Sequence, residues 1–172
     1  MDKDFFLIQK MKSGDEEAME CFVQQYYPVI LKYCRYHIQD REYAKDITQE
    51  TFERFFGRLP EYRYMGKTVN YLYVIAGNLC KSFYQKKTEL VMEELPEQEE
   101  NPMEEIPNQL DVETAVGRLP DELSEVVILY YFQGIKLKEI AQILQIGLPL
   151  VKYRMKKAKK QLRTLLGEEE GI

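Results

Sequence analysis

The chain has 172 residues, of which 45% are hydrophobic and 31% are charged, a balance typical of a globular protein with a buried core. No apolar run approaches the roughly 18 residues that a membrane-spanning helix needs, so we expect no membrane insertion. The N-terminus carries Asp2 and Asp4 and lacks the long apolar stretch of a signal peptide, so we expect a cytoplasmic protein.

The residues that usually carry catalysis or metal binding are few and scattered. The three cysteines, Cys21, Cys34 and Cys80, lie far apart and predict neither a disulfide framework nor a zinc site. His37 is the only histidine, and the sequence has no glycine-rich phosphate loop or nucleophile elbow. We therefore predict a protein without a metal or other cofactor that is not an enzyme.

The net charge of −5 hides an uneven distribution of charge along the chain. Between Lys87 and Arg118 there is no basic residue, and the acids there are Glu89, Glu93, Glu94, Glu97, Glu99, Glu100, Glu104, Glu105, Asp111 and Glu113. The tail adds Glu168, Glu169 and Glu170. Without these thirteen acids, 16 acidic residues stand against 24 basic ones, a net charge of +8. The folded parts are therefore basic, which favours an anionic partner such as nucleic acid.

The N-terminal segment, residues 1–87, predicts four helices. Asp4 can cap the first, and Pro28 either opens a further helix at its first turn or kinks a continuous second one. Asp40 caps a third helix, and a fourth opens at Gly66–Thr68. The apolar stripe of the fourth helix consists of Val69, Leu72, Ala76, Leu79 and Phe83.

An acidic linker with three prolines, residues 88–110, follows, and its composition predicts a flexible chain. The C-terminal segment, residues 111–167, is again helical in pattern and is followed by an acidic tail, residues 168–172. Its helices are expected after a cap at Asp111 and then over Glu122–Phe132, Leu137–Leu144 and Pro149–Leu166. The sequence thus predicts an all-α protein of two small helical domains joined by a flexible acidic linker.

The stretch Leu137–Leu162 has the pattern of a helix-turn-helix motif. The small Ala141 lets a second helix approach closely, and a tight turn at Gln145–Gly147 precedes that helix. The apolar face of the second helix consists of Val151, Met155, Ala158 and Leu162, and its other faces carry Lys152, Arg154, Lys156, Lys157, Lys159, Lys160 and Arg163. Ordinary exposed helices mix acids with bases, so this acid-free helix favours contact with DNA over a merely solvated basic face.

The C-terminal segment carries Leu119–Gly134, Glu139–Ala141 and Val151–Arg154 in order. These motifs resemble region 4 of bacterial RNA polymerase sigma factors of the extracytoplasmic-function (ECF) type. Tyr43–Phe52 resembles their region 2.2 helix, and Tyr71–Asn78 resembles their region 2.3–2.4 helix, with Tyr71 where Trp is common. The resemblance covers nearly the whole chain and implies a region 2 helical bundle and a region 4 helix-turn-helix.

The resemblance also implies partners and site residues. It implies that residues 1–87 bind core RNA polymerase and recognise and melt the −10 element of promoter DNA, and that residues 111–167 recognise the −35 element. Core polymerase would contact Asp46, Gln49, Glu50 and Arg54. The −10 element would contact Arg63, Lys67, Tyr71, Asn78, Lys81, Gln85, Lys86 and Lys87. The −35 element would contact Lys152, Tyr153, Arg154, Lys156, Lys157 and Lys160. The loop Glu61–Lys67 stands where the family captures a flipped base, and an anti-sigma factor is a further partner expected from the family.

Two other functions stay open at this point. A stand-alone helix-turn-helix regulator would explain the C-terminal segment but would leave the N-terminal helices without a role. A helical adaptor could instead use its basic helix to bind an acidic protein. Transcription assays with core polymerase separate these functions, because only a sigma factor makes initiation depend on itself.

Overall fold

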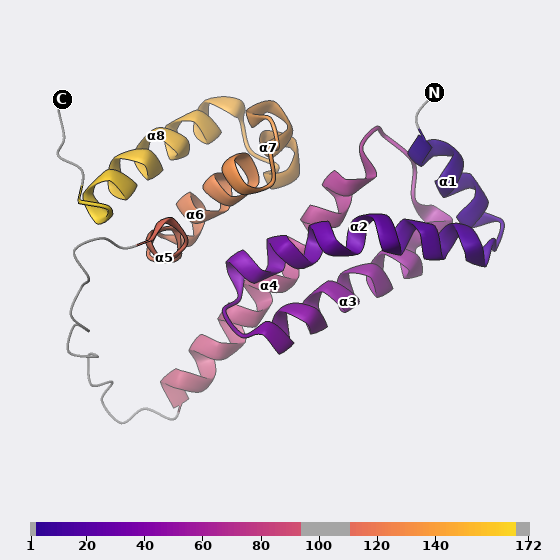
Figure 1. The fold of residues 1–172 in the computed structure, drawn as a ribbon, viewed down its shortest axis with the longest axis horizontal. Helices are drawn as coiled ribbons and strands as arrows, with labels where there is room; N and C mark the ends of the chain where they lie inside the picture. Colours follow the sequence, from indigo (N-terminus) through magenta and orange to yellow (C-terminus); the bar gives the residue numbers. More distant parts are fainter. Residues whose placement is uncertain (1–2, 94–110, 168–172) are drawn as a thin grey trace. The chain divides into compact units, whose positions relative to one another are not determined.

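The computed structural model describes residues 3–93 and 111–167, with side chains described for residues 3–87 and 111–167. Within these ranges all regular secondary structure is helical (Figure 1), which confirms the predicted all-α fold. The chain divides into two compact units, Met1–Ser82 (unit 1) and Phe83–Ile172 (unit 2). No helix of the described part is long and apolar enough to cross a membrane.

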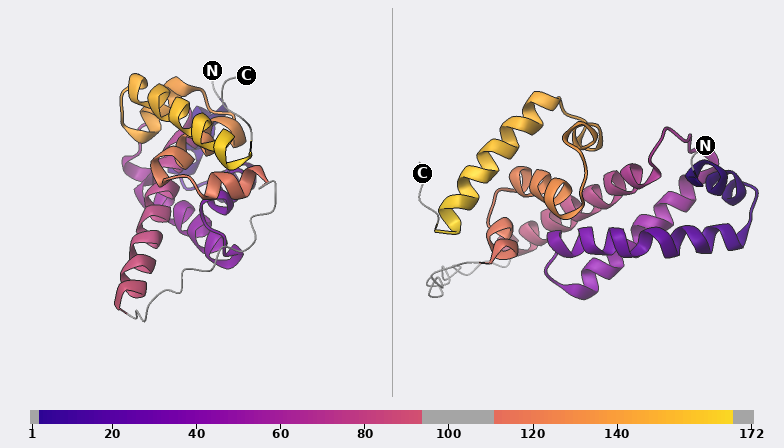
Figure 2. Two further views of the ribbon diagram at one scale, coloured as in Figure 1. Left: turned by 90° about the vertical axis from the view of Figure 1, so that its left-hand side faces the viewer. Right: turned by 45° about the horizontal axis from the view of Figure 1, so that its top comes forward.

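Unit 1 is built on a long helix pair. Its elements are α1 (Lys3–Lys12), α2 (Glu16–His37), α3 (Arg41–Arg58), the 3₁₀ helix η1 (Leu59–Glu61) and α4 (Thr68–Glu93), which continues beyond the unit. α2 packs along α3, and α1 packs on α2 (Figure 1 and Figure 2). α2 is continuous through Pro28, so this proline does not open a further helix. Asp40 caps α3 as predicted, because its carboxylate accepts the backbone N–H of Glu42 at 2.9 Å.

Two expectations for the N-terminal segment need correction. α1 begins at Lys3, so Asp4 lies inside its first turn and is not the cap; its buried carboxylate accepts the hydroxyl of Tyr26 at 2.5 Å instead. α4 runs to Glu93, six residues into the predicted linker, because residues 88–93 contain no proline or glycine and include strong helix formers. The rest of the predicted linker and the acidic tail, residues 94–110 and 168–172, lie outside the described residues.

An aromatic cluster forms the core of unit 1. Phe22 of α2 has no exposed surface, and its ring stacks on Phe55 of α3 with centroids 4.9 Å apart and planes 12° apart. The rings of Tyr26, Phe52 and Phe56 also contact Phe22, at centroid distances of 5.0, 6.1 and 6.1 Å. Such edge and offset contacts add to the hydrophobic gain from burying the rings.

Unit 2 contains five described elements after the end of α4. They are α5 (Val112–Gly117), α6 (Asp121–Val127), the π-helix η2 (Ile128–Phe132), α7 (Leu137–Leu144) and α8 (Leu148–Leu165). Asp111 caps α5 as predicted, since its carboxylate accepts the N–H of Thr114 at 2.7 Å. The helix predicted over Glu122–Phe132 begins one residue earlier, and its second half is a π-helix rather than an α-helix. α8 packs against α5, α6 and α7 and closes the core of the unit.

The central position of Phe22 makes a stability prediction. Replacing Phe22 with Ala removes the ring that contacts four other aromatic rings, and we expect a loss of about 3–5 kcal/mol in the free energy of unfolding of unit 1. The measurement is a urea titration followed by circular dichroism. The control is Phe6→Ala, because this ring is 51% exposed and its removal should cost less than about 1 kcal/mol. Equal unfolding midpoints for the two variants would contradict the central role of Phe22.

Candidate nucleic-acid interface

A tight turn joins α7 to α8 in unit 2. Gln145 ends α7 in the left-handed conformation, with φ of 56° and ψ of 45°, and its N–H donates to the carbonyls of both Ala141 and Gln142. Gly147 caps α8 without a side-chain hydrogen bond, and Pro149 occupies the first turn, where no amide donor is needed. The helix-turn-helix predicted from the sequence therefore forms without the serine or threonine caps that are usual in such motifs.

The two sides of α8 differ sharply in character. Val151, Met155 and Ala158 are buried in the unit, with at most 5% of their surface exposed. The exposed basic residues of the same helix are Lys152, Lys156, Lys157, Lys159, Lys160 and Arg163. Tyr153 lies among them with 60% of its surface exposed, and the helix contains no acid. We define these seven residues as the α8 face.

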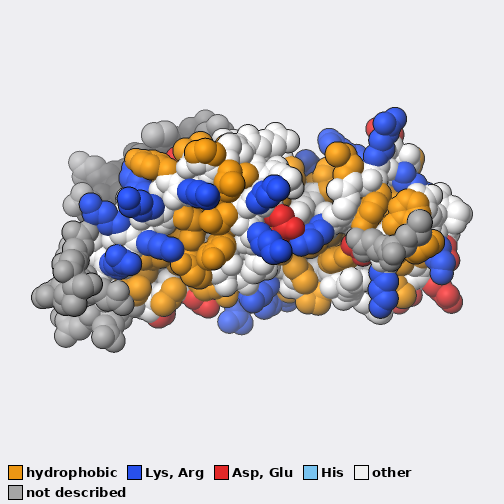
Figure 3. Space-filling view, turned by 90° about the horizontal axis from the view of Figure 1, so that it is seen from above, with side chains coloured by type: hydrophobic (Ala, Val, Ile, Leu, Met, Phe, Trp, Pro, Cys, Tyr) orange, Lys and Arg blue, Asp and Glu red, His pale blue; other side chains and the backbone are white. Residues whose placement is uncertain are grey.

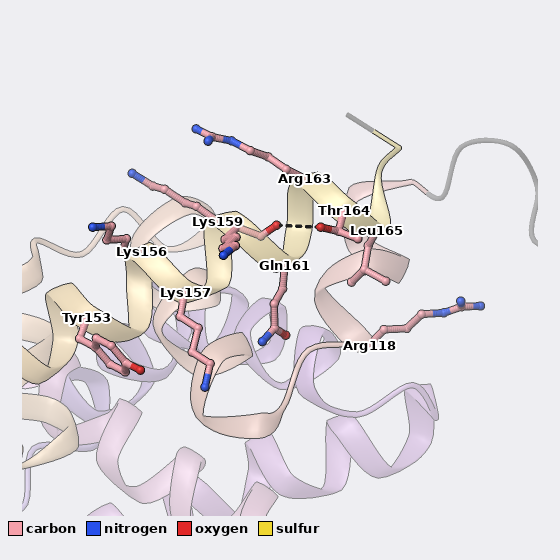
Figure 4. A pocket seen from close by; sticks show the side chains of 10 residues that line it. Arg118, Tyr153, Lys156, Lys157, Lys159, Gln161, Arg163, Thr164 and Leu165 are labelled. Atoms are coloured by element: carbon pink, nitrogen blue, oxygen red, sulfur yellow. Dashed lines mark hydrogen bonds between the residues drawn. The ribbon is translucent and has the colours of Figure 1, made fainter. Parts of the chain in front are cut away.

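The arrangement of the α8 face is visible in two figures. Figure 3 shows Lys and Arg side chains over the part of the surface that α8 forms. Apolar side chains lie between them, and few acids are seen there. Figure 4 shows Lys156, Lys159 and Arg163 extending to one side of the helix, while Lys157 points to the other. Cations spread over more than one side of a helix can contact phosphates on both walls of a DNA groove.

Arg154 differs from the other cations of α8. Its side chain is only 19% exposed, and its guanidinium lies 3.9 Å from the carboxylate of Glu122 in the first turn of α6. Arg154 therefore lies on the flank of α8 that meets α6, beside the α8 face. Its predicted contact with the −35 element stays a prediction, and the ion pair gives it a second role in orienting α8.

A second candidate surface lies in unit 1, at the loop that joins η1 to α4. The ring of Tyr62 stacks on Tyr71 with centroids 5.2 Å apart, and its hydroxyl donates to Oγ1 of Thr68 at 3.3 Å. Burial raises the pKa of the Tyr62 hydroxyl above its ordinary value. Met65 of the same loop is 91% exposed, and Gly66 takes a positive φ of 106° that permits the sharp turn.

The residues predicted to contact the −10 element are mostly exposed. They are Arg63 and Lys67 in the loop and Asn78, Lys81, Gln85, Lys86 and Lys87 on α4. Asn78, Lys81 and Gln85 share one face of α4, because they are three and four residues apart. Tyr71 is half-buried, and one face of its ring is covered by Tyr62. Met65 and Tyr62 were not among the residues predicted to contact the −10 element, although both lie in the predicted loop Glu61–Lys67.

The third predicted surface lies on α3. Asp46 and Gln49 are exposed, and the amide of Gln49 donates to Glu53 at 3.2 Å. Glu50 forms an ion pair with Arg54 at 2.8 Å, so its charge is partly balanced within the helix. Asp46 is therefore the stronger candidate for attracting a basic partner at this surface.

Comparison with known families gives two matches in the order of the units. Residues 22–89 match the Sigma-70 region 2 family, and residues 109–162 match the Sigma-70, region 4 family. Among curated proteins, the ECF RNA polymerase sigma factor SigE of Mycolicibacterium smegmatis is 28% identical to this chain over 173 residues. The match covers 92% of this chain and 66% of the length of SigE, so the chain spans just under two thirds of that relative.

Solved structures share the fold at lower sequence identity. CnrH, solved in complex with the cytosolic domain of CnrY, matches with a TM-score of 0.76 at 20% identity, over 96% of this chain and 98% of CnrH. The sigma factor RpoE of Bartonella quintana, solved with the anti-sigma factor NepR, matches with a TM-score of 0.70 at 18% identity, over 86% of this chain and 96% of RpoE.

The α8 face predicts a salt-dependent affinity for duplex DNA. Lys157→Ala and Lys160→Ala should each weaken binding, and each should lower the slope of log affinity against log salt concentration by about 0.9, the contribution of one phosphate contact. Fluorescence anisotropy in a salt series measures both quantities. Lys10→Ala, which removes an exposed lysine from unit 1, is the control and should keep the original slope. Unchanged slopes in both α8 variants would exclude this face from DNA contact.

Proposed function

Because the chain belongs to the RNA polymerase sigma factors of the ECF type, we propose that it binds core RNA polymerase and directs it to specific promoters. The observation that carries this proposal is the presence of both sigma regions, in order, in one chain. A stand-alone regulator needs only the second of them. In this function the chain recognises DNA and catalyses no reaction itself, and it acts in the cytoplasm, where polymerase and promoters meet.

Region 4 would recognise the −35 element through the α8 face. A helix that enters the major groove reads base edges with a few side chains and holds phosphates with the others. Lys152, Tyr153 and Lys156 lie toward the N-terminal half of α8, the part of a recognition helix that usually reaches the bases. Lys157 and Lys160 would hold the phosphates. The ion pair between Arg154 and Glu122 connects α8 to α6 beside this face.

Region 2 would recognise and melt the −10 element. Unpaired bases need apolar or aromatic surfaces for stacking and cations for the backbone. The η1–α4 loop offers Met65 between Arg63 and Lys67, and α4 continues with the exposed row Asn78, Lys81 and Gln85. Lys86 and Lys87 extend the positive charge along the same helix.

We assign two protein partners to the chain within this proposal. Core polymerase would bind the α3 surface of Asp46, Gln49, Glu50 and Arg54. An anti-sigma factor is the second partner, by extension from the similar RpoE, which was solved with the anti-sigma factor NepR. To prevent DNA binding, such a partner would have to cover both the basic α8 face and the residues of the η1–α4 loop and α4 that would contact the −10 element.

The proposal as a whole is tested by run-off transcription with purified core polymerase. We expect promoter-dependent transcripts only when this chain is added, from templates selected out of a random promoter library with the reconstituted holoenzyme. A stand-alone regulator would bind DNA in the same experiment without making initiation depend on it. An adaptor for acidic proteins would give neither DNA selection nor transcripts.

The α3 surface makes a separate prediction about core binding. Asp46→Arg should weaken binding to core polymerase by at least ten-fold, or about 1.4 kcal/mol, because the change puts a like charge against a basic partner surface. The control is Glu20→Arg, an equally exposed acid on α2 outside the region 2 match. Affinity is measured by titrating labelled protein with core polymerase. Equal affinities for the two variants, both folded by circular dichroism, would remove this surface from the interface.

A further inference from the structure

Helix α1 precedes the part of the chain that matches region 2, yet it contacts the η1–α4 loop at two points. The ammonium group of Lys12 donates a hydrogen bond to the backbone carbonyl of Tyr62. The ring of Phe5 meets the ring of Tyr64 edge to face, with centroids 5.7 Å apart. Phe5 and Lys12 are seven residues apart and so lie on the same side of α1.

α1 is itself firmly attached to the rest of unit 1. Ile8 and Met11 are almost completely buried, with 0% and 1% of their surface exposed. The buried carboxylate of Asp4 accepts the hydroxyl of Tyr26 on α2 at 2.5 Å. A hydrogen bond from a neutral hydroxyl to a buried carboxylate is short and strong when water is excluded. The loop is thus held by an element that is fixed in place.

The loop is also held by residues of α3 and α4. Tyr62 stacks on Tyr71, meets the ring of Phe55 at 5.4 Å and donates to Thr68. Tyr62 and Tyr64 therefore form the inner row of the loop. The alternate residues, Arg63, Met65 and Lys67, are exposed.

The exposed row has the chemistry of a site for single-stranded DNA. Met65 is 91% exposed and offers a polarisable apolar surface to the face of an unstacked base. Arg63 and Lys67, two residues away on either side, can pair with the neighbouring phosphates. A loop that is ordered before binding loses less entropy when the strand arrives, so its affinity depends on what keeps it ordered.

We propose that α1 is a positioning element for the melted promoter strand, which acts by holding the η1–α4 loop through Lys12 and Phe5. The inference rests on the proposed function of the chain, because the ligand of the loop is the −10 strand. Lys12 and Phe5 are positioning residues and do not touch the DNA. If α1 only added bulk to the core, the loss of the Lys12 hydrogen bond would not change DNA binding.

The test compares two lysines of the same helix. Lys12→Ala removes the hydrogen bond to Tyr62, whereas Lys10→Ala removes an equal charge from an exposed side chain of α1. Each variant is assembled with core polymerase and titrated with two probes from a selected promoter. The first is a fork in which the −10 segment is single-stranded, and the second is a duplex that ends before the −10 element.

We expect Lys12→Ala to weaken binding to the fork about three- to ten-fold, the range expected for the loss of one exposed hydrogen bond, and to leave binding to the duplex unchanged. Lys10→Ala should match the unaltered chain on both probes. Lys12→Arg keeps a donor at this position and should recover most of the affinity for the fork. Phe5→Leu should bind the fork more weakly than the unaltered chain but more tightly than Lys12→Ala. This variant keeps an apolar contact with Tyr64 and loses only the edge-to-face geometry.

Three results would overturn the inference while leaving the proposed function intact. They are equal fork affinity for Lys12→Ala and Lys10→Ala, an equal loss on fork and duplex, and failure of Lys12→Arg to recover binding in a folded protein. If the unaltered chain gives no promoter-dependent run-off transcripts, the proposed function fails first. The thermal unfolding midpoint of each variant shows that a loss of fork binding does not come from unfolding of unit 1.

Discussion

The stack of Phe22 on Phe55 is the contact on which the arrangement of unit 1 depends. A unit of about eighty residues has little volume in which to bury apolar surface, and large flat rings fill it more fully than aliphatic side chains. Phe55 reaches past this stack to the rings of Tyr62 and Tyr71, at 5.4 and 6.1 Å. The same ring thus holds α2 against α3 and supports the loop that carries the candidate −10 surface. The aromatic contacts of the core of unit 1 therefore continue into the loop that carries this candidate surface.

Unit 2 depends mainly on packing for its stability, because α5, α6 and α7 have six to eight residues each and α6, α7 and α8 begin without a side-chain cap. Lys136 and Gly147 begin α7 and α8 without a side-chain hydrogen bond. Packing of Ile140, Val151 and Ala158, which have no exposed surface, must supply what the caps do not. The exposed side of α8 collects six cations whose mutual repulsion opposes folding. DNA phosphates would relieve that repulsion, so the unit is built to be more stable when bound.

Much of the fold could be predicted from local sequence signals. An aspartate before an apolar period is a strong local signal for a cap, so Asp40 and Asp111 could be predicted, and α7 spans the predicted Leu137–Leu144. The same signal predicts a cap at Asp4, which is wrong, because its partner Tyr26 lies 22 residues away and no local pattern reveals that contact. The π-helix η2, which follows α6, has no sequence signature either.

In the candidate sites too, features set by neighbouring residues could be predicted from the sequence, whereas contacts between residues far apart in the sequence could not. The helical period of α8 predicts which of its lysines are exposed, but the pairing of Arg154 with Glu122 depends on how α6 crosses α8. Likewise the sequence marks the loop Glu61–Lys67, while the contacts of Phe5 and Lys12 with it connect residues more than forty positions apart. Side chains that act through another element become visible only in three dimensions.

The stacking of Tyr71 on Tyr62 has an optical consequence. The chain has 13 tyrosines and no tryptophan, so its fluorescence is weak and comes from many places at once. The half-buried ring of Tyr71 contacts Tyr62, the first residue of the η1–α4 loop. An indole placed there would be the only strong emitter in the molecule. Its colour and intensity would report the environment of that loop, so the arrival of a melted DNA strand could be followed in real time without any attached dye.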